Sequence, residues 1–206
     1  MIYTADDYME KYQSVLTRLF TKSIGLNFSL SYIERKIAYS DVFSELERSN
    51  ITLIAFNDTE RIYDSIFGNS DNDILMEDDS IYSWLSFVYL HLFLKYKVTF
   101  EMLFIALPIE RALNLFKLYH EMDISQMDGV FAEAITPTSL SCIMDNKKIS
   151  VKALSEKANI PFPTVRALKY GYRSIDKLEA NKLVSLAFAL NVKTETLLSS
   201  IPLVTD

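Results

Sequence analysis

The chain has 206 residues, of which half are apolar and 13% aromatic. This composition supplies a sizeable core and excludes disorder over most of the length. The single cysteine, Cys142, excludes an internal disulfide, and the acidic start of the chain is unlike a secretory signal, so we expect a cytoplasmic protein. Four glycines and five prolines are too few for the turns of a β-sandwich or barrel. We therefore expect an all-α protein.

The net charge of −6 is unevenly distributed along the chain. Residues 1–137 hold 11 basic and 21 acidic residues, a net charge of −10, whereas residues 138–206 hold 10 and 6, a net charge of +4. This change of sign predicts two domains, an acidic helical bundle at 1–137 and a basic domain at 138–206, with the segment at 135–139 as linker. The bundle is expected to dimerise or to bind a protein partner.

The first predicted helix starts at a capping box formed by Thr4 and Asp7. Its apolar residues follow at helical spacing and form one stripe that should pack against the bundle. Further helices are predicted over about 28–38, 40–49 and 58–67, with Ser40 and Asp58 as caps and Gly68 at the exit of the third. The members of the stripe are Tyr8, Tyr12, Val15, Leu16, Leu19 and Phe20.

The segment Ile51 to Phe56 is β-branched and compatible with a strand, but the chain has no second strand-like run with which it could pair. We therefore predict a helix there. Residues 69–79 are predicted to form a solvated acidic loop, because they lack the glycine and the glutamate of a calcium loop.

Four helices complete the predicted bundle: one over 80–97, one capped by Thr99, one opening at Pro108 and one over about 123–134. The apolar run at 81–94 contains Ser83, Ser86 and His91 and is shorter than the ~20 residues of a membrane span. We expect a buried core helix and no membrane partner.

No pattern in the sequence indicates catalysis. The two histidines, His91 and His120, have no metal-ligand spacing to other residues, and a nucleophile elbow and a glycine-rich phosphate loop are both absent. Arg111 and His120 are separated by eight residues, which places them on different helix faces. We therefore expect a protein that is not an enzyme and uses no cofactor.

The C-terminal part carries the most informative pattern. Ser150 can cap a short helix, Asn159 and Ile160 form a turn, and a second short helix starts at the Pro161-Phe162-Pro163 corner and ends at Gly171. A longer helix and a final short helix follow. Two short helices joined by a tight turn form a helix-turn-helix. The residues predicted to face its core are Leu154, Ala158, Val165, Leu168, Leu178, Leu183, Leu186, Leu190, Leu197 and Leu198.

Residues 138–198 resemble the helix-turn-helix domain of the Cro/CI (Xre) repressor family. Beyond the helix pair, the resemblance rests on Gly171 and on the run from Leu186 through Ala187 and Leu190 to Val192. It implies a five-helix domain, DNA as the partner, a homodimer that recognises paired half-sites, and a role in transcription regulation.

The resemblance also implies the DNA-binding residues. The base-reading positions are Phe162, Pro163 and Ala167, none of which can contact guanine with two hydrogen bonds. The chain departs from the family at Val151, where a glutamine commonly contacts phosphate, and at Lys169, where a glutamate is usual. The predicted DNA-binding set is Lys152, Phe162, Thr164, Arg166, Lys169, Tyr172 and Arg173, with Lys147, Lys148 and Tyr170 nearby.

Two alternatives remain open at the level of sequence. The basic residues can simply form a solvated face that binds nothing. The chain can also be a protein-interaction module, such as an antitoxin or a phage-defence component, in which the helix-turn-helix has reduced DNA readout. In that case the acidic bundle is the working surface, and it suits a basic partner or mimics a nucleic acid.

Overall fold

The computed structural model describes residues 5–48, 50, 52–68, 79–135 and 138–198. Over these residues the chain forms 14 α-helices and one 3₁₀ turn, with no strand, so the all-α prediction is confirmed. The N-terminal helices are α1 (Ala5–Gly25), α2 (Leu30–Ala38), α3 (Asp41–Glu47), α4 (Thr52–Phe56), α5 (Thr59–Phe67), α6 (Ser80–Tyr96), α7 (Phe100–Ala106), α8 (Ile109–Tyr119) and α9 (Gln126–Ile135).

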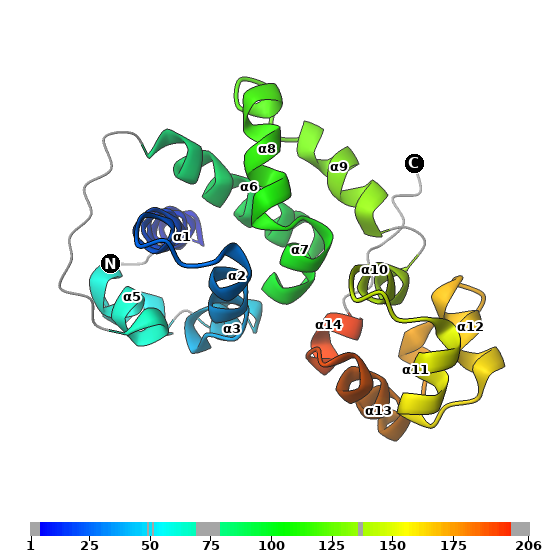
Figure 1. Cartoon of the computed structure of the whole chain (residues 1–206). Coiled ribbons are helices and arrows are strands. Elements are labelled where there is room, and N and C mark those ends of the chain that lie inside the picture. The colour runs from blue at the N-terminus through cyan, green and yellow to red at the C-terminus, as the bar shows by residue number, and fades with distance from the viewer. Residues whose placement is uncertain (1–4, 49, 51, 69–78, 136–137, 199–206) are drawn as a thin grey trace.

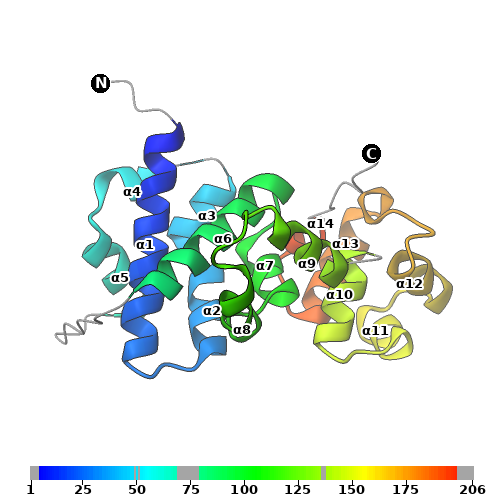
Figure 2. The same cartoon turned by 90° about the horizontal axis from the view of Figure 1, so that it is seen from above.

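Five α-helices follow after residue 137. They are α10 (Ser139–Asn146), α11 (Val151–Ala158), α12 (Phe162–Lys169), α13 (Ala180–Leu190) and α14 (Thr194–Leu198), with the 3₁₀ turn Ile175–Lys177 between α12 and α13. Figures 1 and 2 place α1 and α5 at one end of the molecule and α11 and α12 at the other.

Helix α1 packs along α6 and against α5, and this contact organises the N-terminal bundle. The stripe predicted for α1 is buried from Tyr12 to Phe20, and Tyr8 is half-buried. Helix α6 buries residues around most of its circumference, as predicted for a core helix. No helix in the described ranges is long and apolar enough to cross a membrane.

Three predicted helix caps are confirmed. Ser40 accepts a hydrogen bond from the Phe43 N–H at the start of α3, and Asp58 and Thr99 do the same for the third residue of α5 and of α7. The segment at 52–56 is a helix, as predicted, with Ile54 buried. These elements follow from short-range chemistry, because each cap bonds an N–H group that the first helical turn leaves free.

Other predicted boundaries differ from the structure. Helix α8 begins after Pro108, which is its N-cap residue, and Leu178 precedes α13 because the 3₁₀ turn delays the start of that helix. Leu198 is exposed, because α14 turns Thr196 and Leu197 inward and the next residue lies about 100° further round the helix. The capping box at Thr4 and Asp7, the acidic loop at 69–78 and linker residues 136–137 lie outside the residues whose side chains the structure describes.

Helices α7 and α9 lie between the N-terminal bundle and the last five helices (Figure 2). Helix α10 packs against α7, α9 and α14 and buries Leu140, Ile143 and Met144 there. The buried apolar residues on the two sides belong to one continuous core. The C-terminal helices are therefore docked on the bundle through apolar contacts.

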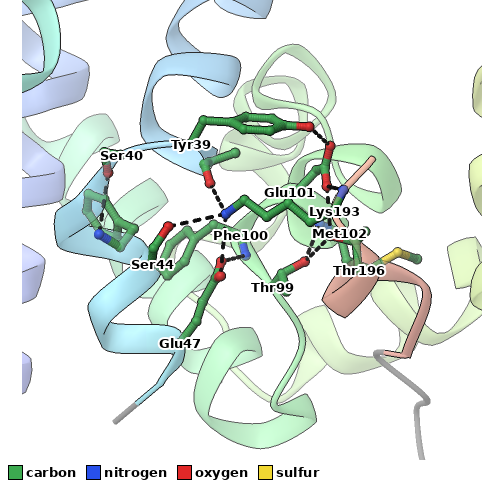
Figure 3. A network of polar contacts seen from close by, with 12 residues as sticks. Tyr39, Ser40, Ser44, Glu47, Thr99, Phe100, Glu101, Met102, Lys193 and Thr196 are labelled. Atoms are coloured by element: carbon green, nitrogen blue, oxygen red, sulfur yellow. Dashed lines mark hydrogen bonds and ion pairs between the residues drawn. The ribbon is translucent and has the colours of Figure 1, made fainter. Parts of the chain in front are cut away.

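Lys193, at the start of α14, extends its side chain across this junction (Figure 3). Its ammonium group donates to the backbone oxygen of Ala38, to Ser44 Oγ at 3.4 Å and to Glu47 Oε2 at 3.5 Å. The side chains of Lys193 and Glu47 are only 17% and 12% exposed. Burial raises the pKa of Glu47 above its ordinary value, whereas the Phe100 N–H and Lys193 lower it.

Glu101 of α7 forms the second half of the same network. Its carboxylate accepts hydrogen bonds from the hydroxyl of Tyr39, from the Lys193 N–H at 2.9 Å and from Thr196 Oγ1 at 2.7 Å. Thr99 and Thr196 also share a hydrogen bond of 2.9 Å. One buried carboxylate thus joins the end of α2 to the start of α14 (Figure 3).

Replacing Lys193 by alanine should lower the free energy of unfolding by about 2 kcal/mol, because the substitution removes the cation beside the carboxylate of Glu47 and the donor to the Ala38 oxygen, while the backbone bond to Glu101 remains. Urea unfolding of the full chain measures this loss. The control is Lys182→Ala, which breaks an exposed pair with Glu179 on α13 and should cost less than ~0.5 kcal/mol. Equal losses in the two variants would contradict a stabilising role for Lys193.

Candidate nucleic-acid interface

A three-residue turn, 159–161, joins α11 to α12. Ser150 accepts a hydrogen bond from the Ala153 N–H and so caps α11, as predicted. Asn159 ends the helix in the left-handed conformation, with φ of 54°, and the Ile160 N–H donates to the Ser155 oxygen at 3.0 Å. Ser155 Oγ donates back to the Ile160 oxygen at 2.6 Å. These bonds fix the direction in which α12 leaves the turn.

The packing of the helix pair follows the predicted pattern. Leu154 and Ala158 of α11 and Val165 and Leu168 of α12 are buried, together with Ile160 of the turn. Helix α11 also packs against α13, and α12 against α10. Because one side of α12 is held in this way, its other side faces solvent at the end of the molecule remote from α1 (Figure 2).

The outward side of α12 carries Phe162, Pro163 and Arg166, which are all exposed. Phe162 and Arg166 are four residues apart and therefore lie on one stripe of the helix. Ala167 and Thr164 are half-buried. Among the base-reading positions that the family resemblance implies, Phe162 and Pro163 are thus exposed, Phe162 by 45%, and Ala167 is half-buried.

The start of α12 offers few backbone donors. Pro161 is the N-cap residue and provides no capping side chain, while Pro163 has no N–H group. The N–H groups of Thr164 and Val165 both donate to the Pro161 oxygen, at 2.9 and 3.2 Å. The Phe162 N–H is therefore the donor that the first turn of α12 retains for an anion.

Lys169 is bound within the protein. Its ammonium group lies 2.7 Å from Asp145 Oδ1 of α10, and its side chain is only 16% exposed. Its backbone oxygen accepts a hydrogen bond from Thr138 Oγ1 at 3.0 Å. Lys169 thus joins α12 to α10, a role that the sequence interpretation missed. The available signal was Asp145 itself, which is the one acidic residue between positions 138 and 155.

The loop after α12 presents aromatic and basic side chains together. Tyr172 is 82% exposed, Tyr170 is about half-exposed, and their ring centroids lie 6.3 Å apart. Arg173 is exposed, and its N–H donates to the Ala167 oxygen at 3.2 Å, which holds the loop against α12. Gly171 permits the turn with φ of 75°.

The structure therefore divides the predicted site residues into two groups. Arg166, Tyr172 and Arg173 are exposed on α12 and the loop that follows it, and Lys152 is exposed on the first turn of α11. Thr164 and Lys169, in contrast, are partly withdrawn from solvent.

The histidines are accounted for by local contacts. His91 is half-buried and hydrogen-bonded to Asp128 at 3.0 Å, while His120 stacks on Phe116 with ring centroids 4.5 Å apart. The residues that the structure describes contain no group of three or more His, Cys, Asp or Glu side chains able to hold a metal ion.

The junction residues were also missed by the sequence interpretation. Glu101 is the single charged residue between positions 98 and 109, in an otherwise apolar segment. A lone charge in such a segment indicates a bonded, buried carboxylate, and that signal was available. Lys193 gave no comparable signal, because its partners are more than 90 residues away in the chain.

Comparison with known protein families, with curated proteins and with solved structures found no match for this chain. The case for a function therefore depends on the residues and contacts of this chain alone.

Proposed function

We propose that the chain is a DNA-binding protein that regulates transcription through the α11–α12 helix-turn-helix. The observation that carries the proposal is the helix pair itself. Its turn is fixed by hydrogen bonds, its inner side is buried, and the outer side of α12 is free to enter a major groove.

The charge distribution supports this proposal. Residues 138–206 have a net charge of +4, and Lys152, Arg166 and Arg173 are exposed on or beside the helix pair. Helices α1 and α5 of the N-terminal part lie at the opposite end of the molecule (Figure 1). Because charges in solution are screened over roughly 10 Å at moderate salt, acidic side chains at that end repel phosphate at α12 only weakly.

The same surface is poorly equipped to read bases. Phe162 and Pro163 can touch a thymine methyl group but provide no side-chain donor, and the start of α12 has lost backbone donors to proline. The proposed mode is therefore binding to phosphates through arginine, lysine and tyrosine side chains, with weak sequence preference.

The variant Arg166→Ala/Arg173→Ala should weaken binding to all DNA sequences alike. Each lost phosphate contact should flatten the slope of log K against log salt by about 0.9, so the slope should fall by about two in total. Fluorescence anisotropy of labelled duplexes at several salt concentrations measures both effects. Arg48→Ala/Arg61→Ala removes the same charge from two exposed side chains of the N-terminal bundle and should retain the wild-type slope. An unchanged slope in the α12 variant would contradict the proposed interface.

Replacing Phe162 by alanine should change discrimination between DNA sites by no more than ~1 kcal/mol, because an apolar contact to a methyl group carries little information. Selection from random duplexes, performed with both proteins, provides the measurement. A sharp palindrome with fixed guanines that disappears in the variant would instead establish direct base readout by α12.

The proposed DNA-binding form is a homodimer formed through the bundle. Phe87 and Leu94 of α6, Leu118 of α8 and Met122 of the segment after α8 are exposed apolar side chains, and α6 and α8 contact each other. A second copy of the chain that covers these side chains would remove them from water.

Sedimentation of the full chain at micromolar concentration should therefore show a dimer. Leu118→Glu should convert it to a monomer, because Leu118 is 63% exposed in the single chain and the new charge would be buried in the proposed dimer interface. The control Phe188→Glu alters an 85% exposed side chain on α13 and should leave the dimer intact. A monomeric wild type, or a dimer lost only in the α13 variant, would rule out the α6–α8 face.

A protein-interaction module is the second candidate function. It is favoured by the pairing of Lys169 with Asp145 and by the loss of donors at the start of α12, since both reduce the capacity of the helix pair to hold DNA. If the wild-type chain shows no salt-dependent binding to duplex DNA at low ionic strength, this second function replaces the first.

A further inference from the structure

A cavity of about 810 Å³ opens between α2, α3, α4 and α5 and reaches the residue that follows α13, Asn191. This volume lies within the range typical of sites for small molecules. Val42, Leu53, Ile62 and Ile66 supply apolar lining, and Arg35, Lys36 and Arg61 supply positive charge. The cavity is therefore amphiphilic, with a cationic part and an apolar part.

The positive charge is unusual for its location. Residues 1–137 contain 21 acidic and 11 basic residues, yet three of those basic side chains line this one cavity and only one acidic side chain, Asp41, accompanies them. Positive charges gathered in one cavity repel each other, and a bound anion would relieve that repulsion.

The three cationic side chains also form few ion pairs. Within the described residues no carboxylate pairs with Arg35 or Lys36, whose charged groups lie 5.9 and 5.7 Å from the ring centre of Tyr32. Arg61 makes a 3.5 Å contact with Asp58, and both side chains are mostly exposed. Such an exposed pair contributes little and exchanges easily for a stronger partner.

Four of the five neutral polar side chains that line the cavity already form hydrogen bonds within the protein. Ser40 caps α3, Asn57 donates to the Leu53 oxygen, Ser65 donates to the Ile62 oxygen, and Tyr39 donates to Glu101. Recognition of a ligand therefore falls mainly to the cationic side chains. Arginine and lysine side chains that line one cavity suit a phosphate group, because guanidinium binds phosphate oxygens in pairs and ammonium adds a point charge.

We propose that this cavity binds a small phosphorylated molecule of nucleotide size, with its phosphates at Arg35, Lys36 and Arg61 and its apolar body against the isoleucine and leucine side chains. The cavity lies beside the junction between the N-terminal bundle and the last five helices. Tyr39 contributes to the cavity wall and to the Glu101 network, and Asn191 belongs to the C-terminal helices. A bound molecule therefore contacts both sides of the junction and stabilises their docked arrangement.

Titration calorimetry of the full chain without DNA tests the site with three probes: ADP, pyrophosphate and adenosine. ADP should bind, pyrophosphate should bind more weakly because it lacks the base and sugar that pack against the aliphatic lining, and adenosine should show no binding because it lacks the phosphates. Since no DNA is present, the result is independent of the proposed DNA-binding function.

The variant Arg35→Gln/Lys36→Gln should lower the affinity for ADP at least tenfold. Arg111→Gln/Lys117→Gln on α8 makes the same change of charge away from the cavity and should leave the affinity unchanged. If the first variant does not fold, as judged by circular dichroism, Arg61→Gln alters an exposed side chain and should lower the affinity at least threefold. Failure of wild-type protein to bind ADP and pyrophosphate at millimolar concentration, or an equal loss in the α8 variant, would overturn the proposal.

Discussion

The carboxylate of Glu101 is the constraint on which the relative position of the two halves of the chain depends. A charged group that is nearly excluded from water is stable only when it is hydrogen-bonded, and Glu101 obtains its bonds from Tyr39 on one side and from Lys193 and Thr196 on the other. The donors of Lys193 and Thr196 are in place only when α14 lies beside α7. Since α10 packs against both α7 and α14, and α12 against α10, the direction of α12 follows from the same junction.

Local chemistry explains which parts of this fold could be predicted. The caps at Ser40, Asp58, Thr99 and Ser150 each require only an oxygen and an N–H group a few residues apart, so the sequence displays them directly. The turn at Asn159 and the spacing of the buried residues in α11 and α12 can be recognised in the sequence for the same reason. The α12–α10 ion pair and the Lys193 network connect residues from 24 to more than 90 positions apart, and no periodic pattern encodes such pairings.

The outer side of α12 and the junction together define how the proposed DNA-binding function would operate. The helix is held by apolar packing on its inner side and by Lys169 at its end, so its orientation is well defined. Its outer side carries few groups that distinguish one base from another. A regulator of this kind would obtain its selectivity from the number and spacing of its subunits on DNA more than from individual base contacts.

The two prolines that flank Phe162 affect the unfolded chain as well as the folded one. Each proline restricts its own backbone and that of the preceding residue, so the corner between α11 and α12 samples fewer conformations before folding. Where the native backbone fits proline, such a restriction raises the free energy of unfolding by roughly 0.4–1 kcal/mol. The two prolines thus remove backbone donors for phosphate but also lower the conformational entropy that the chain loses on folding. The backbone at the corner that directs α12 is therefore already restricted in the unfolded chain.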